Sequence, residues 1–240
     1  KIVLSQYRSL NQKYSRLDER LVGEFNPHYR IWSSLQNLGS VINNAFSIQG
    51  PEFLMYYLTN PQLVKAFFNN ILQLMLLCLD YFPKIDGFPL QHVFVGNCTV
   101  AMISPSQYRN FNSSFDLQIM EFARQKGADF LMHQDSGATP HLENYADFVY
   151  LQALDFGQDT DFEKLVQLFP SVSLNCILFP QWFYDSSLED IAEELTRIIT
   201  ITKTLPSLSF TLYEIDTFLT QEKILSFYEV FRKCVEKVQN

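Results

Sequence analysis

The fold is decided by the stretch Ala128–Pro180, which reads ADFLMHQDSGATPHLENYADFVYLQALDFGQDTDFEKLVQLFPSVSLNCILFP. Short apolar runs in it predict three strands, over 128–133, 151–156 and 172–179. Helix starts lie between the strands, at Thr139-Pro140 and at Asp159 or Thr160. The runs are apolar almost throughout instead of alternating with polar residues. This is typical of parallel strands that helices cover on both faces.

The same alternation continues on both sides of this stretch. Two further strands are predicted, over 91–97 and 208–215, and a short one over 28–32. Further helices are predicted over 61–82, with Thr59 or Asn60 as the cap, and over 104–127, with Ser104 as the cap. Two more are predicted, one to residue 204 with Ser186 or Ser187 as the cap and one over 220–238. Five consecutive strand–helix units indicate an α/β protein, either a TIM (β/α)8-type barrel or an open doubly wound sheet. Neither G-x-G-x-x-G nor G-x-x-x-x-G-K-[ST] occurs, so a dinucleotide or P-loop site is not expected.

Composition narrows the class of protein. The chain has 240 residues, of which 47% are hydrophobic and 18% charged, and this composition favours a packed protein of one or two domains. The formal net charge is −8, so neither nucleic acid nor an anionic membrane is expected as a partner.

The cysteines and the apolar runs indicate in which cellular compartment the protein is expected. Four cysteines lie far apart in apolar runs with no C-x-x-C pair, which predicts buried free thiols and a reducing, cytoplasmic setting. The stretch 71–82 is interrupted by Gln73 and Asp80, so we expect it to be too short and too polar to span a membrane. Residues 1–20 hold charged helix formers and predict no signal peptide.

Polar side chains gather where the predicted strands end, which is the working face in both candidate architectures. The sharpest case is His133-Gln134-Asp135, since residues i and i+2 of a strand point to the same side. Glu214 at the end of the last strand could complete a His/Asp/Glu metal site. A metal-free acid–base or substrate-binding pair and a purely structural hydrogen bond remain alternatives for His133 and Asp135.

Other residues are predicted to border the same face. They are Asn97, Cys98, His141, Asp155 and Trp182. Cys98 is a conceivable nucleophile with His92 or His133 as its basic partner. The alternatives are a solvated helix-start histidine for His141, capping and solvation for Asp155, and packing under a loop for Trp182.

Several motifs, in the same order along the chain, resemble those of the uroporphyrinogen decarboxylase superfamily, which includes corrinoid-dependent methyltransferases. The resemblance spans residues 28 to 215, and its motifs are Gly50-Pro51-Glu52, Thr59–Val64, Gly96-Asn97, Ile103–Phe111, His133–Gly137 and Glu189-Asp190-Ile191. It implies a (β/α)8 barrel. The arginine-rich motif R-Q-A-G-R of the decarboxylases does not occur. A decarboxylase or other lyase acting on a tetrapyrrole or small carboxylate is therefore the second hypothesis, and a non-catalytic ligand-binding barrel is the third.

The methyltransferases hold zinc with H-x-C-x-G and a second cysteine at the last strand. Here Asp135 and Glu214 stand at the two cysteine positions. The resemblance therefore implies that His133, Asp135 and Glu214 hold zinc or another divalent metal, with His133 and Asp135 as catalytic residues. It also implies a corrinoid carried by a partner protein and a small-molecule acceptor. The substrate-binding residues are then Asn97, His141, Asp155 and Trp182.

The matched motifs begin at what corresponds to the third strand of the family. We therefore expect a barrel that lacks or shortens its first strands, with an N-terminal segment over 1–27 and the barrel domain over 28–240. An incomplete barrel exposes strand edges. A compensating N-terminal segment or a homo-oligomer is accordingly expected.

Overall fold

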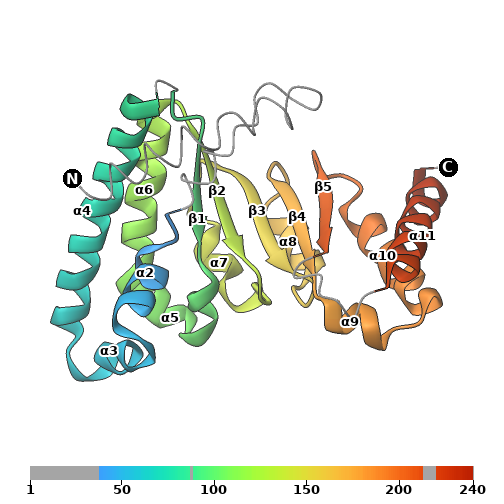
Figure 1. Ribbon diagram of the computed structural model, residues 1–240, viewed down its shortest axis with the longest axis horizontal. Helices are drawn as coiled ribbons and strands as arrows, with labels where there is room; N and C mark the ends of the chain where they lie inside the picture. The colour runs from blue at the N-terminus through green and yellow to red at the C-terminus, as the bar shows by residue number, and fades with distance from the viewer. Residues whose placement is uncertain (1–37, 87–88, 213–219, 240) are drawn as a thin grey trace. The chain divides into compact units, whose positions relative to one another are not determined.

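The computed structural model describes residues 38–86, 89–212 and 220–239 (Figure 1). By its contacts the chain divides into residues 1–37 and 38–240. Everything below concerns the second unit. The predicted strand over 28–32, the end of the last predicted strand and Glu214 lie outside the described residues.

One parallel sheet organises the unit. Its strands are β1 (His92–Gly96), β2 (Asp129–Gln134), β3 (Leu151–Gly157), β4 (Ser173–Leu178) and β5 (Leu208–Leu212), in the order β1-β2-β3-β4-β5. All five predicted strands in this part of the chain are confirmed. A doubly wound sheet reverses its strand order at a switch point, whereas here each strand neighbours the next in the chain. The sheet is therefore an arc of a TIM-like fold, and the described residues show five strands without closure of a barrel.

Helices and short helical turns follow or flank the strands (Figure 1). They are α2 (Val41–Gln49), η2 (Pro51–Met55), α3 (Tyr56–Thr59), α4 (Pro61–Asp86), η3 (Cys98–Met102), α5 (Pro105–Gln107), η4 (Tyr108–Asn112), α6 (Ser113–Lys126), η5 (Thr139–His141), α7 (Leu142–Tyr145), α8 (Phe162–Leu168), α9 (Pro180–Asp185), α10 (Leu188–Thr202) and α11 (Gln221–Gln239). The segment between β2 and β3 forms only the short η5 and α7, because it must pack closely against the sheet with Leu142 and Tyr145 fully buried.

Local sequence signals explain where the helices begin. The Asn60 side chain accepts a hydrogen bond from the backbone N–H of Leu63 at the start of α4. Ser104 caps α5 and Ser187 caps α10, each within a capping box. The cap of α8 was predicted wrongly, since Asp161 takes this position instead of Asp159 or Thr160. The Thr160 hydroxyl is instead bound to the backbone oxygen of Gly157 at 2.7 Å.

The two faces of the sheet differ. In β2, Phe130 and Met132 are buried towards the helices, whereas Leu131 and His133 point to the other face and are only half-buried. The prediction of strands buried on both faces therefore holds at the carboxyl end of β4, where Cys176, Ile177 and Leu178 are all buried, but not for β2. The reason is that the face of the sheet on which His133 lies, which we call the inner face, carries polar side chains within otherwise apolar runs. Asp155 and Asn175 are among them.

Helix α4 meets, over Pro61–Tyr81, the length and composition of a membrane-spanning helix. The expectation that this region is too short to span was therefore wrong. Core helices meet the same criterion, and one face of α4 buries Val64, Phe68 and Leu72 completely in the core.

Candidate functional site

The candidate site lies at the carboxyl ends of β1, β2 and β3. His133 is the next-to-last residue of β2 and lies on the inner face, and its register partner on β3 is Asp155. The His133 Nδ1 atom lies 3.1 Å from Asp155 Oδ2, and the two side chains are 14% and 21% exposed. The structure thus pairs His133 with Asp155 through Nδ1. This pairing fixes the orientation of the His133 ring.

A second element brings Cys98 to the same place. The backbone N–H of Asn97 donates a 2.6 Å hydrogen bond to the carbonyl oxygen of His133, which ties the start of η3 to the end of β2. Cys98 follows directly as the first residue of η3. One ligand atom each of Cys98, His133 and Asp135 then lie within 4.8 Å of one another.

The loop that carries Asp135 is held close to the end of β3. The N–H of Gly157 donates to the carbonyl oxygen of Ser136 at 3.2 Å. A Cβ atom at Gly157 would lie 2.7 Å from the backbone oxygen of Asp135. Glycine is therefore required at position 157, because any side chain would push the Asp135 loop away from the strand.

Electrostatics favour a protonated imidazole at neutral pH. Burial lowers the pKa of His133, but the hydrogen bond to Asp155 and the interaction with Cys98 raise it more, to about 10. A metal ion would therefore have to displace a proton from His133. It follows that metal affinity at this site should increase with pH.

The inner face extends the site as a row of polar side chains. His133, Asp155, Asn175 and Ser209 are consecutive register partners across β2, β3, β4 and β5. The hydroxyls of Ser209 and Thr211 lie 2.8 and 3.0 Å from Asn175 Oδ1. Both donate to that one oxygen, so the Asn175 amide group is oriented along the inner face.

Two of the predicted substrate-binding residues lie in a buried polar network behind the sheet. Asn97 is fully buried, and its amide donates to Asp116 Oδ2 at 3.0 Å. The Tyr108 hydroxyl donates to the same oxygen at 2.8 Å. His141 is 2% exposed, and the Tyr108 and Tyr145 rings lie against its imidazole. The structure therefore places Asn97 and His141 together with Asp116, away from solvent.

Burial governs the ionisation of this network. It raises the pKa of Asp116 to about 6, against the hydrogen bonds from Asn97 and Tyr108, which lower it. It also lowers the pKa of His141, against backbone hydrogen bonds with Ile103 and Val100. Four buried polar atoms here have no hydrogen-bond partner, namely Asn97 Oδ1, Asn112 Nδ2, Asp116 Oδ1 and His141 Nδ1.

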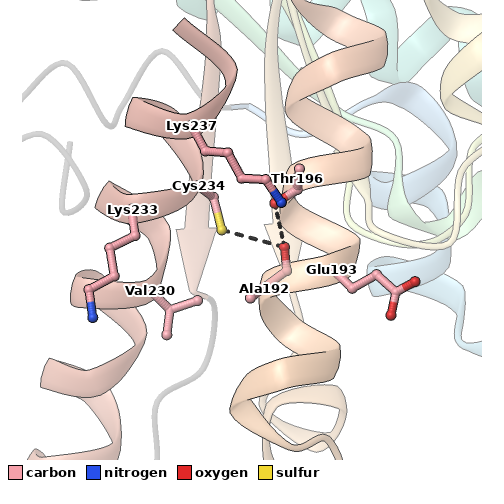
Figure 2. A pocket seen from close by; sticks show the side chains of 7 residues that line it. All are labelled: Ala192, Glu193, Thr196, Val230, Lys233, Cys234 and Lys237. Atoms are coloured by element: carbon pink, nitrogen blue, oxygen red, sulfur yellow. Dashed lines mark hydrogen bonds between the residues drawn. The ribbon is translucent and has the colours of Figure 1, made fainter. Parts of the chain in front are cut away.

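The remaining predicted residues lie elsewhere. Trp182 lies in α9, half-buried against the core. A groove of about 400 Å³ lies between α10 and α11 (Figure 2), and none of the predicted site residues lines it. All four cysteines are free thiols, as expected, but only Cys176 and Cys234 are buried, whereas Cys78 and Cys98 are half-buried.

Sequence reasoning missed the roles of three residues in the candidate site and in the buried polar network beside it. Cys98 was considered as a nucleophile, whereas the structure places its sulfur with His133 and Asp135 as a ligand set. Asn175 and Asp116 were not predicted. A single polar residue inside an apolar strand, as in VSLNCILF, could have indicated Asn175.

Comparison with known proteins supports the fold. No protein-family model and no curated protein matches the sequence. Among solved structures, a methyltransferase from Methanosarcina mazei matches 84% of this chain with a TM-score of 0.61 and 11% sequence identity. The chain spans 58% of the length of that protein. At this identity the match shows that the two chains share an α/β fold.

Proposed function

We propose that this protein is a methyltransferase that moves a methyl group from a corrinoid carried by a partner protein to a small acceptor. The observation that carries the proposal is the convergence of Cys98, His133 and Asp135 at the carboxyl ends of parallel strands. Active sites of TIM-like folds are built at this end. The shared fold with a methyltransferase and the resemblance of the motifs support the same reaction class.

The donor set fits a divalent metal. A thiolate, an imidazole and a carboxylate are ligands that zinc accepts, and three protein ligands leave a position open for an acceptor. When bound, zinc would supply Lewis acidity that favours the deprotonated form of a thiol or hydroxyl acceptor. We propose that Glu214, at the predicted end of the last strand, is a ligand that occupies the fourth position until the acceptor takes it.

The chain's own residues then have separate roles. Asp155 holds the His133 ring in one orientation through Nδ1, as an outer partner of a ligand histidine does. We assign to Asn175, Ser209 and Thr211 the binding of polar groups of the acceptor, because they continue the row from His133 along the inner face.

Metal content of protein purified without a polyhistidine tag tests the proposal. We expect about one zinc per chain, and we expect the Cys98→Ala and His133→Ala variants to lose it. Cys78→Ala is the matched control, since Cys78 is a half-buried free cysteine on α4. Methyl transfer from methylcobalamin to a small thiol should follow the same pattern. Full metal content in both site variants would refute this ligand set.

A metal-free lyase is the second candidate. The specific observation in its favour is the hydrogen-bonded pair His133–Asp155, in which the pKa of the imidazole is raised to about 10 and the ring can act as a proton donor. Turnover of a small carboxylate or of uroporphyrinogen by chelator-treated protein, lost in His133→Ala, would favour this candidate over methyl transfer.

A further inference from the structure

The glutamine between two of the proposed metal ligands is buried behind the sheet. Gln134 ends β2 between His133 and Asp135, and it is completely buried. Because successive side chains of a strand point to opposite faces, Gln134 turns into the layer between the sheet and the helices, as Phe130 and Met132 do. An amide group in this layer is costly unless its hydrogen bonds are made within the protein. The partners of the Gln134 amide group therefore indicate why a glutamine occupies this position.

The amide group of Gln134 closes a turn around Asp135. Its Nε2 atom donates to the carbonyl oxygen of Gly137 at 3.2 Å and lies 3.5 Å from the Ser136 Oγ atom. The side chain thus bridges the backbone on both sides of Asp135 and Ser136, and the four residues form a closed ring. The position of Asp135 therefore depends on the orientation of the Gln134 amide group.

A buried tyrosine determines this orientation. The hydroxyl of Tyr145, in α7, donates to Gln134 Oε1, and Tyr145 is completely buried. Since Oε1 accepts this bond, the Nε2 donor is directed to the Gly137 carbonyl oxygen. The Tyr108 and Phe148 rings meet the Tyr145 ring edge to face, at centroid distances of 5.6 and 6.3 Å. Side-chain packing thus holds the hydroxyl at the Gln134 amide group.

The loop that carries Asp135 is also tied to the end of β3. The Gly157 N–H donates to the carbonyl oxygen of Ser136 at 3.2 Å, and the Ala138 N–H donates to the Thr160 hydroxyl at 3.0 Å. Both N–H groups can exchange with solvent only when these bonds open. Their exchange rates therefore report whether the loop is in place, with or without a metal ion.

We propose that Gln134, oriented by Tyr145, is the positioning residue of the loop that carries Asp135. For the role of Asp135 as a metal ligand, this inference rests on the proposed function. Loss of a partner that orients a ligand typically weakens metal binding by about 10–100-fold. The same size of effect is expected when the Gln134 amide group loses its orientation.

Three variants separate positioning from packing. Tyr145→Phe removes the hydroxyl and keeps the packed ring. Tyr57→Phe is the matched control, because the buried Tyr57 hydroxyl also donates to a side-chain amide oxygen, that of Asn112 at 2.9 Å, and neither residue lies in the loop. The double variant Gln134→Met/Tyr145→Phe replaces both partners by apolar groups of similar shape. It thereby removes the unpaired buried amide oxygen that Tyr145→Phe leaves, and should recover stability without closing the turn.

The first measurement is amide hydrogen exchange by NMR on the full 240-residue chain in the presence of a chelator. Exchange at Gly157 and Ala138 should be at least about tenfold faster in Tyr145→Phe than in Tyr57→Phe, although both variants lose a buried hydrogen bond. In the double variant the urea midpoint should return towards that of the wild type, while these two amides still exchange fast. Equal exchange in the two single variants, or slow exchange in the double variant, would overturn the inference.

The second measurement is zinc affinity by competition with a chromogenic chelator. Tyr145→Phe and the double variant should bind zinc about 10–100-fold more weakly than the wild type, and Tyr57→Phe should bind it equally well. Wild-type affinity in the double variant would show that the two hydrogen bonds contribute to stability alone, and would overturn the inference. A wild-type protein that binds no zinc would instead refute the proposed ligand set, and the exchange rates would still decide whether Gln134 positions the loop.

Discussion

Replacing Asp116 by asparagine should stabilise the protein, and the gain should depend on pH. Asp116 is completely buried, and burial raises its pKa from 3.8 to about 6. Its Oδ2 atom accepts hydrogen bonds from Asn97 and Tyr108, which an asparagine oxygen can also accept. Its Oδ1 atom has no hydrogen-bond partner. The substitution therefore removes a buried charge and keeps both hydrogen bonds. Its new amide N–H groups stand where Oδ1 has no hydrogen-bond partner, at a cost that does not depend on pH.

The size of the effect follows from the two pKa values. Because the pKa is higher in the folded state, the ionised carboxylate lowers the free energy of unfolding, and this loss grows between about pH 4 and pH 6 and is constant above. The difference of roughly two pKa units corresponds to about 3 kcal/mol at pH 8. At pH 5 the Asp116 carboxyl group is protonated in the folded protein but mostly ionised in the unfolded chain. The loss in the free energy of unfolding is then about 1.5 kcal/mol.

Urea unfolding of the wild type and of Asp116→Asn at pH 5 and pH 8 measures this difference. We expect the stability of the variant relative to the wild type to be about 1.5 kcal/mol higher at pH 8 than at pH 5. Asp147→Asn removes the same charge from an exposed position and should change neither value. An equal effect of Asp116→Asn at both pH values would refute the argument, because it would show that Asp116 does not titrate between them.

Three further predictions follow from the site and its supports. Asp155→Asn should lower the pKa of His133 from about 10, because burial then acts against the interaction with Cys98 alone, and an NMR titration of the ring would show it. Gly157→Ala should cost about 1–3 kcal/mol in urea unfolding, because its Cβ would lie 2.7 Å from the Asp135 backbone oxygen. Ser187→Ala should cost about 1 kcal/mol, because it removes the cap of α10, whereas Ser187→Thr, which keeps the hydroxyl that donates to Asp190 Oδ2, should retain most of this stability.

The sequence predicted the order of the strands and helices better than the contacts between side chains of different strands. The apolar runs that became β1 to β5 and the start signals at Asn60, Ser104 and Ser187 are local features, and the structure confirms them. The pairing of His133 with Asp155 needs the strand register, which no local pattern contains.

The candidate site shows the same limit. Cys98 joins His133 and Asp135 only because a backbone hydrogen bond ties η3 to the end of β2. Asn97 and His141 were placed correctly beside strand ends and helix starts, but their side chains turn into the layer between the sheet and the helices. The side of the sheet towards which such a side chain points depends on packing partners from distant parts of the chain. For Asn97 these partners are Tyr108 and Asp116.

The strand order also determines how this protein can be made. Each of the strands β2 to β5 pairs with the strand that precedes it in the chain, so each of them finds its template already present when it leaves the ribosome. β1 and β2 can pair while β5 is still being synthesised. Sheet assembly can therefore proceed by stepwise addition from the amino-terminal side, and each step closes only one strand–helix–strand loop.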